Sequence, residues 1–394
     1  MNQNCIDQVD VYVLKLDQHY RLAGHEDTPG RLPGTDYFRE PQWRQAYSAK
    51  TETCLVKVTT AGGVAGWGEA QAPITPEAAA VLVEKLLGPA VIGEDALATE
   101  AIYERLYHLM SARGQQFGFY LDAMGAIDTA LWDIRGKVWQ APVCSLLGGP
   151  FRTELPAYIS GLRRPDRVQR LAVAQECMSK GFAGVKIFSG LAPHVVMEEL
   201  HDVRHAIGPQ AFLGFDAIQA YGAREALEIG MALDGMRGNW LEAPVGADDI
   251  AGHARLAGRL ATPIAAGEHL RSVAQFLPWL QAGAIGVAQP DVVRCGISAA
   301  RKIANLAQAF HVGAALHLGV ASGIGAAATW QLAAALPNFV VQEHQLDLFD
   351  TANRILREPL RERDGMLQVP LKPGLGIEVD EAVIQEMGAW HCRT

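Results

Sequence analysis

The chain has 394 residues, of which 49% are hydrophobic and 20% charged, and its formal net charge is −9. These values are typical of a globular protein and exclude a collagen-like, coiled-coil or disordered chain. Lys and Arg form no block, which argues against nucleic-acid binding, and no apolar run reaches the roughly 18–20 residues of a membrane span.

The six cysteines are scattered, and none forms a Cys-x-x-Cys pair. That spacing is typical of neither a zinc knuckle nor a disulfide framework, and it favours a reducing compartment. The first residues, MNQNCIDQVD, lack the charged and apolar regions of a signal peptide. We therefore expect a cytoplasmic protein with a small-molecule partner, and neither a nucleic acid nor a membrane partner.

The first 120 residues predict a mixture of strands and helices. Alternating residues at 9–16 predict a strand, and residues 53–70 predict a hairpin around a Gly-rich turn. Between them, residues 17–47 are rich in Gly, Pro, His and aromatic residues without a period, which is typical of a functional or disordered loop. Helical patterns follow at 75–88, 98–112 and 119–139.

From residue 155 the pattern changes to short apolar runs that alternate with amphipathic helical stretches. The runs lie at 155–160, 184–188, 212–217, 239–244, 263–268, 285–291, 313–318 and 339–344. A strand followed by a helix, repeated about eight times, is the signature of parallel βα units. Eight such units close most economically into a TIM-type barrel, so the sequence predicts an α/β fold.

Seven of these runs carry a polar side chain near the C-terminal end. Barrel strands point these ends at one face, where barrel active sites lie, so the seven are expected to converge. A single acid after a strand is usually a helix N-cap, but caps do not explain seven positions in register. The seven residues are Lys186, Asp216, Glu242, Glu268, Asp291, His317 and Glu343.

Three acids, Asp216, Glu242 and Glu268, follow three successive predicted strands. Three carboxylates that meet at one point require a hard divalent cation, and all-oxygen ligation suits Mg²⁺ or Mn²⁺. No cysteine is nearby, which disfavours zinc. The alternative interpretation is a buried carboxylate cluster that holds a proton.

The other four residues suit acid–base chemistry. Lys186 is either a base or an electrostatic partner for a substrate carboxylate. Asp291 and His317 follow adjacent strands, and a carboxylate beside a histidine fixes its tautomer and raises its basicity, as in a general base. Glu343 is expected to exchange a hydrogen bond opposite the metal. Together they suit removal of a proton α to a carboxylate, because a divalent metal and cationic donors stabilise the enediolate.

Longer segments extend this pattern over nearly the whole chain. They are AMGAIDTALWDIRGKVWQAPVCSLLGG (123–149), GFDAIQAY (214–221), NWLEAPV (239–245), AAGEHL (265–270), QPDVVRCGISAARKIA (289–304), ALHLG (315–319) and PGLGIEV (373–379). Together they resemble the enolase superfamily, and within it the mandelate racemase subgroup. The resemblance implies a modified (β/α)₇β barrel at 131–365. It also implies an α+β capping domain built from residues 1–130 and the C-terminal segment 366–394.

The resemblance also implies roles for the converging residues. Asp216, Glu242 and Glu268 would be the metal ligands, with one Mg²⁺ per subunit. His317 would be the base with Asp291 as its partner, and Glu343 would hydrogen-bond the substrate carboxylate. Members of this family commonly form homo-oligomers based on dimers, often octamers.

The sequence departs from the racemase at the end of the second barrel strand. The racemase has Lys-x-Lys there, whereas this chain has Lys186, Ile187 and Phe188. By alignment, Phe188 replaces the lysine that serves as the base on the opposite face, and Phe cannot transfer a proton. One base suits β-elimination of water, so an acid-sugar dehydratase is predicted. The alternatives are a cycloisomerase of a sugar-acid lactone or anhydro-sugar acid, a racemase or epimerase, and a non-catalytic binding barrel.

In this family, substrate specificity comes from loops of the capping domain, which correspond here to residues 17–47 and 69–76. Their polar and aromatic residues are candidates to bind a polyhydroxy acid, although each taken singly is equally well explained as part of a solvated loop. The candidates for substrate binding are His25, Tyr37, Trp43 and Arg44 in the long loop, Gln115 at a helix junction, and Phe188.

Overall fold

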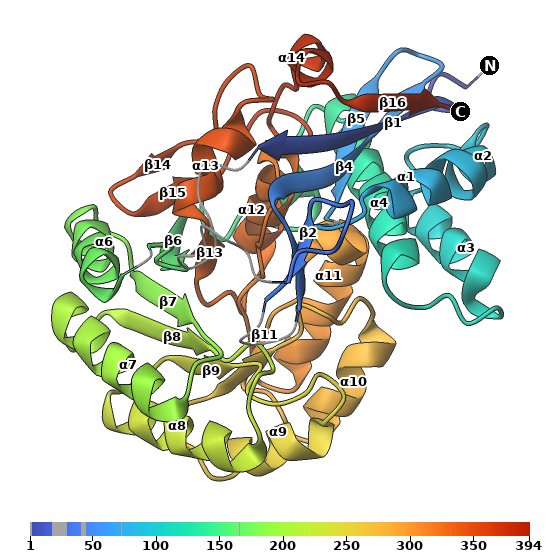
Figure 1. Ribbon diagram of the computed structural model, residues 1–394. Coiled ribbons are helices and arrows are strands. Elements are labelled where there is room, and N and C mark those ends of the chain that lie inside the picture. Colours follow the sequence, from blue (N-terminus) through green and yellow to red (C-terminus); the bar gives the residue numbers. More distant parts are fainter. Residues whose placement is uncertain (1, 18–29, 41–44, 72, 165) are drawn as a thin grey trace.

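A computed structural model describes residues 2–17, 30–40, 45–71, 73–164 and 166–394. Figure 1 shows a layered domain, which holds both ends of the chain, beside a barrel of strands with helices outside. None of the helices in the described part of the chain combines the length and the apolar character that a membrane span requires.

The capping domain is built on an antiparallel sheet of four strands in the order β16-β1-β4-β5. The strands are β1 (Ile6–Asp17), β4 (Lys50–Thr60), β5 (Ala65–Ala70) and β16 (Trp390–Arg393). The predicted first strand and hairpin are confirmed. The described part of the long loop contains a small hairpin of β2 (Tyr37–Arg39) and β3 (Ala46–Ser48), which the aperiodic sequence did not predict.

Helices cover one face of this sheet, and two glycines let the longest helix approach closely. The covering helices are α1 (Glu77–Leu82), a π-helical turn η1 (Val83–Leu87), α2 (Gly88–Val91), α3 (Thr99–Ser111) and α4 (Phe119–Val138), which is the longest. A Cβ atom on Gly68 of β5 would lie 1.8 Å from the carbonyl oxygen of Ala126 in α4, and one on Gly66 would lie 2.1 Å from that of Ala130. Only glycine permits this packing.

Eight parallel strands form the barrel, which confirms the predicted alternation. Sheet pairing runs from β12 to β6 in reverse chain order, β13 pairs with β6, and a bridge between Ala314 and Phe339 closes the circle. The strands are β6 (Glu154–Ser160), β7 (Gly184–Phe188), β8 (Phe212–Asp216), β9 (Trp240–Glu242), β10 (Ile264–Ala266), β11 (Val287–Ala288), β12 (Gly313–Ala314) and β13 (Gln342–His344).

A helix follows each barrel strand. These helices are α6 (Arg167–Ser179), α7 (Pro193–Ile207), α8 (Ala223–Gly235), α9 (Ile250–Ala257), α10 (Val273–Gln281), α11 (Val292–Ala309), α12 (Gly323–Ala335) and α13 (Leu346–Asn353). The short α5 (Val143–Leu146) joins the capping domain to β6.

After α13 the chain contacts both parts of the molecule. The hairpin of β14 (Glu362–Arg363) and β15 (Met366–Gln368) adds antiparallel to β6, and after α14 (Glu381–Glu386) strand β16 pairs with β1. The proposed boundary at residue 130 falls inside α4. The division at 1–130, 131–365 and 366–394 stays a prediction.

A layer of aromatic side chains fills the barrel beneath its C-terminal face. Tyr158, Phe212 and Trp240 are buried, with ring centroids 4.6–5.3 Å apart in stacked and edge-to-face pairs. The ammonium group of Lys186 lies 5.6 Å above the centre of the Tyr158 ring. These packed rings therefore form an aromatic floor under the charged residues of the face above.

Candidate active site

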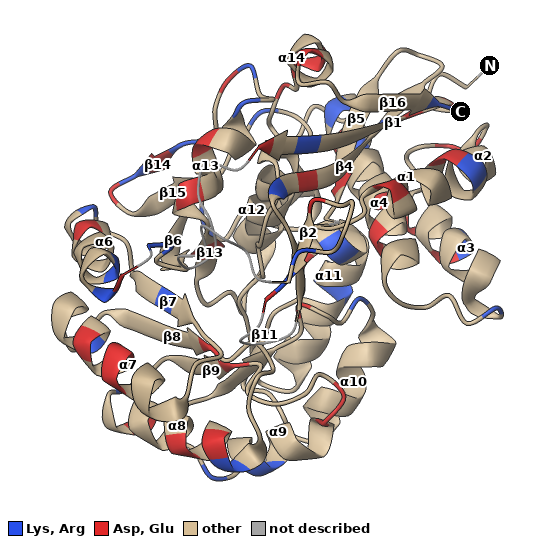
Figure 2. Ribbon diagram, viewed as in Figure 1, with Lys and Arg blue, Asp and Glu red and all other residues tan. Residues whose placement is uncertain are grey.

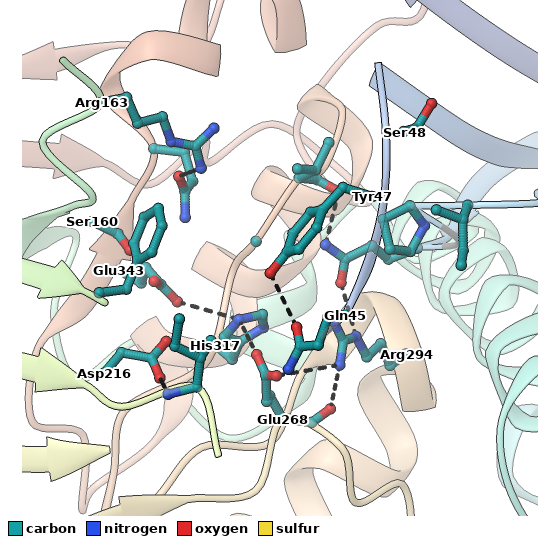
Figure 3. A pocket seen from close by; sticks show the side chains of 18 of the residues that line it. Gln45, Tyr47, Ser48, Ser160, Arg163, Asp216, Glu268, Arg294, His317 and Glu343 are labelled. Carbon is teal, nitrogen blue, oxygen red and sulfur yellow. Dashed lines mark hydrogen bonds and ion pairs between the residues drawn. The ribbon is translucent and has the colours of Figure 1, made fainter. Parts of the chain in front are cut away.

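A cavity of about 220 Å³ lies where the C-terminal ends of the barrel strands meet the capping domain. In Figure 3, Asp216, Glu268 and His317 lie on the barrel side, and Gln45 and Tyr47 extend toward them from the capping domain. Figure 2 shows charged positions on β7, β8 and β9, although the neighbouring strand residues carry no charge. Both parts of the molecule therefore build the cavity wall.

The structure brings all seven predicted polar residues together at this face. Five of them line the cavity, and the other two, Glu242 and Asp291, contact lining residues directly. Three lie within or at the ends of strands β7, β8 and β9, and Glu343 lies in β13. The remaining three follow β10, β11 and β12 within three residues. The convergence follows from the parallel strand order.

Lys186 is buried between two carboxylates. Its Nζ lies 3.0 and 2.9 Å from the two oxygens of Glu242 and 2.9 Å from Oε1 of Glu343. Burial disfavours the charged amine, but the Glu242 and Glu343 carboxylates outweigh burial and hold the pKa of Lys186 well above its usual value. Lys186 is therefore a fixed positive charge in the wall of the cavity.

Further donors hold the Glu242 carboxylate in place. Its Oε2 accepts hydrogen bonds from Gln289 Nε2 at 2.8 Å and from Trp240 Nε1 at 3.2 Å. The next residue, Ala243, has a φ of +41°, a left-handed conformation that non-glycine residues rarely adopt. Such strain is concentrated at functional sites, where the surrounding structure enforces it.

His317 and Asp291 form the predicted dyad. Nδ1 of His317 lies 2.6 Å from Oδ2 of Asp291, so Nδ1 carries the proton and its N–H donates a hydrogen bond to the carboxylate. The other oxygen, Oδ1, accepts from the backbone N–H of Val293 at 2.8 Å and caps α11. Asp291 is thus both the dyad partner and the helix N-cap that the sequence offered as alternatives.

The second nitrogen of His317 faces Glu268. Nε2 lies 2.6 Å from Oε2 of Glu268, and Glu343 Oε2 is 3.9 Å away. Burial disfavours the charged imidazole, but Glu268 and Glu343 outweigh burial and raise the pKa of His317 well above its usual value. The same contact, with the charge of Arg294, lowers the pKa of Glu268 well below its usual value against the effect of burial.

The third predicted ligand, Asp216, ends β8 at the same place. Burial, and then the negative charge of Glu242, raise the pKa of Asp216 well above its usual value, and Glu268 adds to this effect. Among the described residues, no three acidic, histidine or cysteine side chains are arranged as a ready metal site. Glu242 bonds to Lys186, and Glu268 bonds to His317. The three carboxylates, of which Glu242 is buried while Asp216 and Glu268 are half-buried and line the cavity, nevertheless form an all-oxygen donor set that fits a hard divalent cation.

Several further cavity residues were not predicted as site residues, among them Gln45, Tyr47, Gln71 and Arg294. Arg294 lies three residues after Asp291 on α11, one helical turn away, and this spacing was the available signal. Gln71 lies within the loop predicted for specificity. Gln45 and Tyr47 share a hydrogen bond of 3.0 Å, but no pattern in the aperiodic loop distinguished them from their neighbours.

The candidates for substrate binding lie in different places. Phe188 lines the cavity. Tyr37 does not, because its hydroxyl donates to Glu52 at 3.0 Å and accepts from the backbone N–H of Thr75 at 3.0 Å. Gln115 lies instead in a groove on the capping domain, next to Phe117. The remaining candidates lie outside the described residues: His25, Trp43 and Arg44.

Two family models match the chain. Residues 40–148 match the N-terminal domain of mandelate racemase and muconate lactonizing enzyme, and residues 169–383 match the enolase C-terminal domain-like family. The D-galactarolactone cycloisomerase of Agrobacterium fabrum is 34% identical over 84% of this chain and 90% of its own length. The arabinonate dehydratase of Saccharolobus solfataricus is 31% identical over 85% of this chain and 90% of its own.

A solved structure agrees with these matches. The L-talarate dehydratase of Polaromonas sp. JS666, complexed with Mg and L-glucarate, is 25% identical. It superposes with a TM-score of 0.82 over 99% of both chains. The barrel, the capping domain and the matched models agree with one another over nearly the whole length of the chain. The chain therefore belongs to the enolase superfamily, in the group of mandelate racemase and muconate lactonizing enzyme.

Proposed function

We propose that the protein is a Mg²⁺-dependent lyase that removes the α-proton of a sugar acid and then eliminates water, an acid-sugar dehydratase. The observation that carries this proposal is the His317–Asp291 dyad at a cavity that Phe188 also lines. Phe188 ends β7 and stands where the racemase has its second lysine. Two-base racemisation requires an acid–base group on each face of the α-carbon, one to remove the proton and one to deliver it, and a phenyl ring can do neither. One base is sufficient for an elimination.

In the proposed reaction, each partner of the dyad has a step. His317 Nε2 takes the α-proton, and the electron pair of the C–H bond forms the enediolate of the substrate carboxylate. The enediolate then expels the hydroxyl on the β-carbon, which leaves as water with the proton from His317. The resulting enol takes a proton from solvent at C3, loses the proton of its C2 hydroxyl to solvent, and becomes a 2-keto-3-deoxy acid. Asp291 keeps the Nδ1 proton in place, so that Nε2 faces the cavity.

Asp216, Glu242 and Glu268 are the residues that would hold Mg²⁺, which supplies Lewis-acid stabilisation of the enediolate charge when bound. The clustering of the three carboxylates at one cavity supports this assignment, as does the Mg in the related talarate dehydratase structure. Oε2 of Glu268 now bonds to His317 Nε2. This oxygen cannot bind both His317 Nε2 and a cation fully. Binding of a cation by Glu268 would therefore release Nε2 of His317 to act as the base.

A cycloisomerase is the second candidate, favoured by the 34% identical relative that bears the name D-galactarolactone cycloisomerase. The same base would take the α-proton, and the ring oxygen of a lactone or anhydro sugar would be the leaving group. No water is lost in that reaction. The two candidates therefore differ in the substrate and not in the catalytic residues.

A substrate screen in deuterium oxide tests the proposal. Aldonic acids, aldaric acids and their lactones are incubated with the protein and Mg²⁺, and products are followed by proton NMR. A dehydratase converts open-chain acids to 2-keto-3-deoxy acids, whereas a cycloisomerase acts only on the ring forms. Phe188→Ala is expected to change substrate preference and to retain α-proton exchange. Efficient interconversion of both enantiomers of a simple 2-hydroxy acid, with deuterium at C2, would contradict the single-base mechanism.

A further inference from the structure

We propose that Gln71 and Arg294 are positioning residues for the His317–Asp291 dyad, so that docking of the capping domain completes the catalytic site. The proposal rests on the proposed function, in which His317 is the base. It concerns how that base is held, and it assigns a chemical role to a residue of the capping domain that lies outside the dyad and the predicted ligands.

Arg294 lies between the dyad and a predicted metal ligand. Its Nη1 donates to the main-chain carbonyl of Glu268 at 2.9 Å, and the carboxylate of Glu268 is 4.0 Å away. Its Nε lies 3.6 Å from Oδ2 of Asp291, the oxygen that accepts the hydrogen bond from His317 Nδ1. One guanidinium, whose side chain is 16% exposed, therefore stabilises the Asp291 anion and fixes the backbone at Glu268.

Gln71 connects this guanidinium to the loop after His317. Its side-chain oxygen accepts from Arg294 Nε at 3.0 Å, and its Nε2 donates to the carbonyl of Val320 at 2.9 Å. Its backbone N–H also donates to the carbonyl of Val293 at 2.9 Å. The residue follows β5 of the capping domain and is only 3% exposed. All three partners belong to the barrel.

Gln71 and His317 pack closely against the same glycine, Gly319. A Cβ atom on Gly319 would lie 2.7 Å from Nε2 of Gln71 and 3.1 Å from Cε1 of His317. Gln71 and His317 thus both contact Gly319. A shift of the capping domain would therefore press Gln71 against the barrel residues that follow His317. The position of the base is therefore coupled to the position of the capping domain through Gln71 and Arg294.

Variants of the two residues test this inference by kinetics. Arg294→Met is expected to lower kcat about 100-fold or more with KM within about threefold, because it removes a transition-state contribution and not uniform binding. Arg294→Lys restores the charge and is expected to recover part of kcat. Gln71→Ala is expected to lower kcat about tenfold. The double variant Gln71→Ala/Arg294→Met is expected to be no worse than Arg294→Met alone, because coupled residues are not additive.

Ser298→Ala is the matched control. Ser298 is also on α11 and also contacts the capping domain, where its hydroxyl donates to Asp128 at 2.5 Å. It does not line the cavity. This variant is expected to lower the melting temperature and leave kcat unchanged. Equal losses of kcat in Ser298→Ala and Arg294→Met would show a general docking effect and overturn the inference, as would a raised KM with unchanged kcat in Arg294→Met.

A second readout needs no substrate and separates this inference from the proposed function. The Nδ1 proton of His317 is observed as a downfield proton resonance, assigned by its loss in His317→Asn. The chemical shift of this resonance is expected to change in Arg294→Met and Gln71→Ala and to remain unchanged in Ser298→Ala. Unchanged resonances in both positioning variants would overturn the inference even if the enzyme is active. A failed substrate screen with shifted resonances would contradict the proposed function alone.

Discussion

Asp291 divides its two oxygens between the dyad and the backbone. Oδ2 accepts from His317 Nδ1 at 2.6 Å, and Oδ1 accepts from the N–H of Val293 at 2.8 Å. The carboxylate is fully buried, so neither bond competes with water. The helix cap thereby fixes the carboxylate that in turn fixes the tautomer of the base.

Replacing Asp291 with Asn separates these two jobs. Asn is as good an N-cap as Asp, so α11 keeps its first turn and the free energy of unfolding changes little. The amide nitrogen, however, donates to Nδ1 and places the histidine proton on Nε2, where the base must be free. We expect α-proton exchange to fall by roughly 10²–10⁴-fold with little change in melting temperature. Exchange at the wild-type rate would show that the dyad does not set the tautomer.

At the scale of elements, one carboxylate of the capping domain caps a barrel helix. Glu69 of β5 accepts from the backbone N–H groups of Ser322 and Gly325 at the start of α12, at 2.8–3.0 Å. The hydroxyls of Thr53 and Ser322 donate to it as well, each at 2.6 Å. Burial raises the pKa of Glu69, while these donors oppose the shift.

Substituting Glu69 with Gln tests this cap. The amide group turns one acceptor into a donor that faces buried N–H groups, and an unsatisfied buried donor costs about 1–3 kcal/mol. We expect the free energy of unfolding, measured by urea titration, to fall by that amount. Glu154→Gln is the control, because its ion pair with Arg363 is exposed and contributes little. Equal effects of the two substitutions would contradict the role of Glu69 as a cap.

The contact between α4 and α11 gives a prediction about pH. Asp128 is buried and accepts from the N–H and the hydroxyl of Ser298, and burial raises its pKa to about 7 against the effect of these donors. The folded state therefore binds this proton more tightly than the unfolded state, whose Asp has a pKa of about 4. Between these two pH values, the contribution of Asp128 to the free energy of unfolding falls as the pH rises.

Asp128→Asn removes that titration. We expect the difference in unfolding free energy, wild type minus variant, to decrease by a few kcal/mol at most between about pH 4 and pH 7. Urea titrations of both proteins at several pH values measure it. Parallel stability curves would mean that Asp128 titrates alike in the folded and unfolded states.

At the scale of the whole molecule, local patterns predicted the barrel and the ring of polar residues because both depend on chain order. A strand-end residue such as Glu242 meets its neighbours wherever parallel strands close into a barrel. The contact of Gln71 with Arg294 could not be predicted in this way, because it forms only when two domains dock. Tyr37 lies in an aperiodic loop, where no period indicates which side chains reach the cavity.

The clustering of carboxylates in the closed barrel gives a prediction about metal. A ligand that binds only the folded state raises the free energy of unfolding by RT ln(1 + [L]/Kd), which is about 2.7 kcal/mol at a ligand concentration 100 times Kd. Mg²⁺ would relieve the repulsion that contributes to the raised pKa of Asp216. We therefore expect Mg²⁺ to raise the melting temperature of chelator-treated protein by a few degrees and to restore activity.

Variants and a salt control locate this effect. Glu242→Gln and Asp216→Asn remove one ligand each, and both are expected to keep the fold and to lose the stabilisation by Mg²⁺ together with activity. Na⁺ at matched ionic strength is expected to raise the melting temperature far less. It only screens charges over the whole protein and does not bind specifically between the three carboxylates. Full activity after chelation, or equal stabilisation of wild type and both variants by Mg²⁺, would contradict a metal site at these residues.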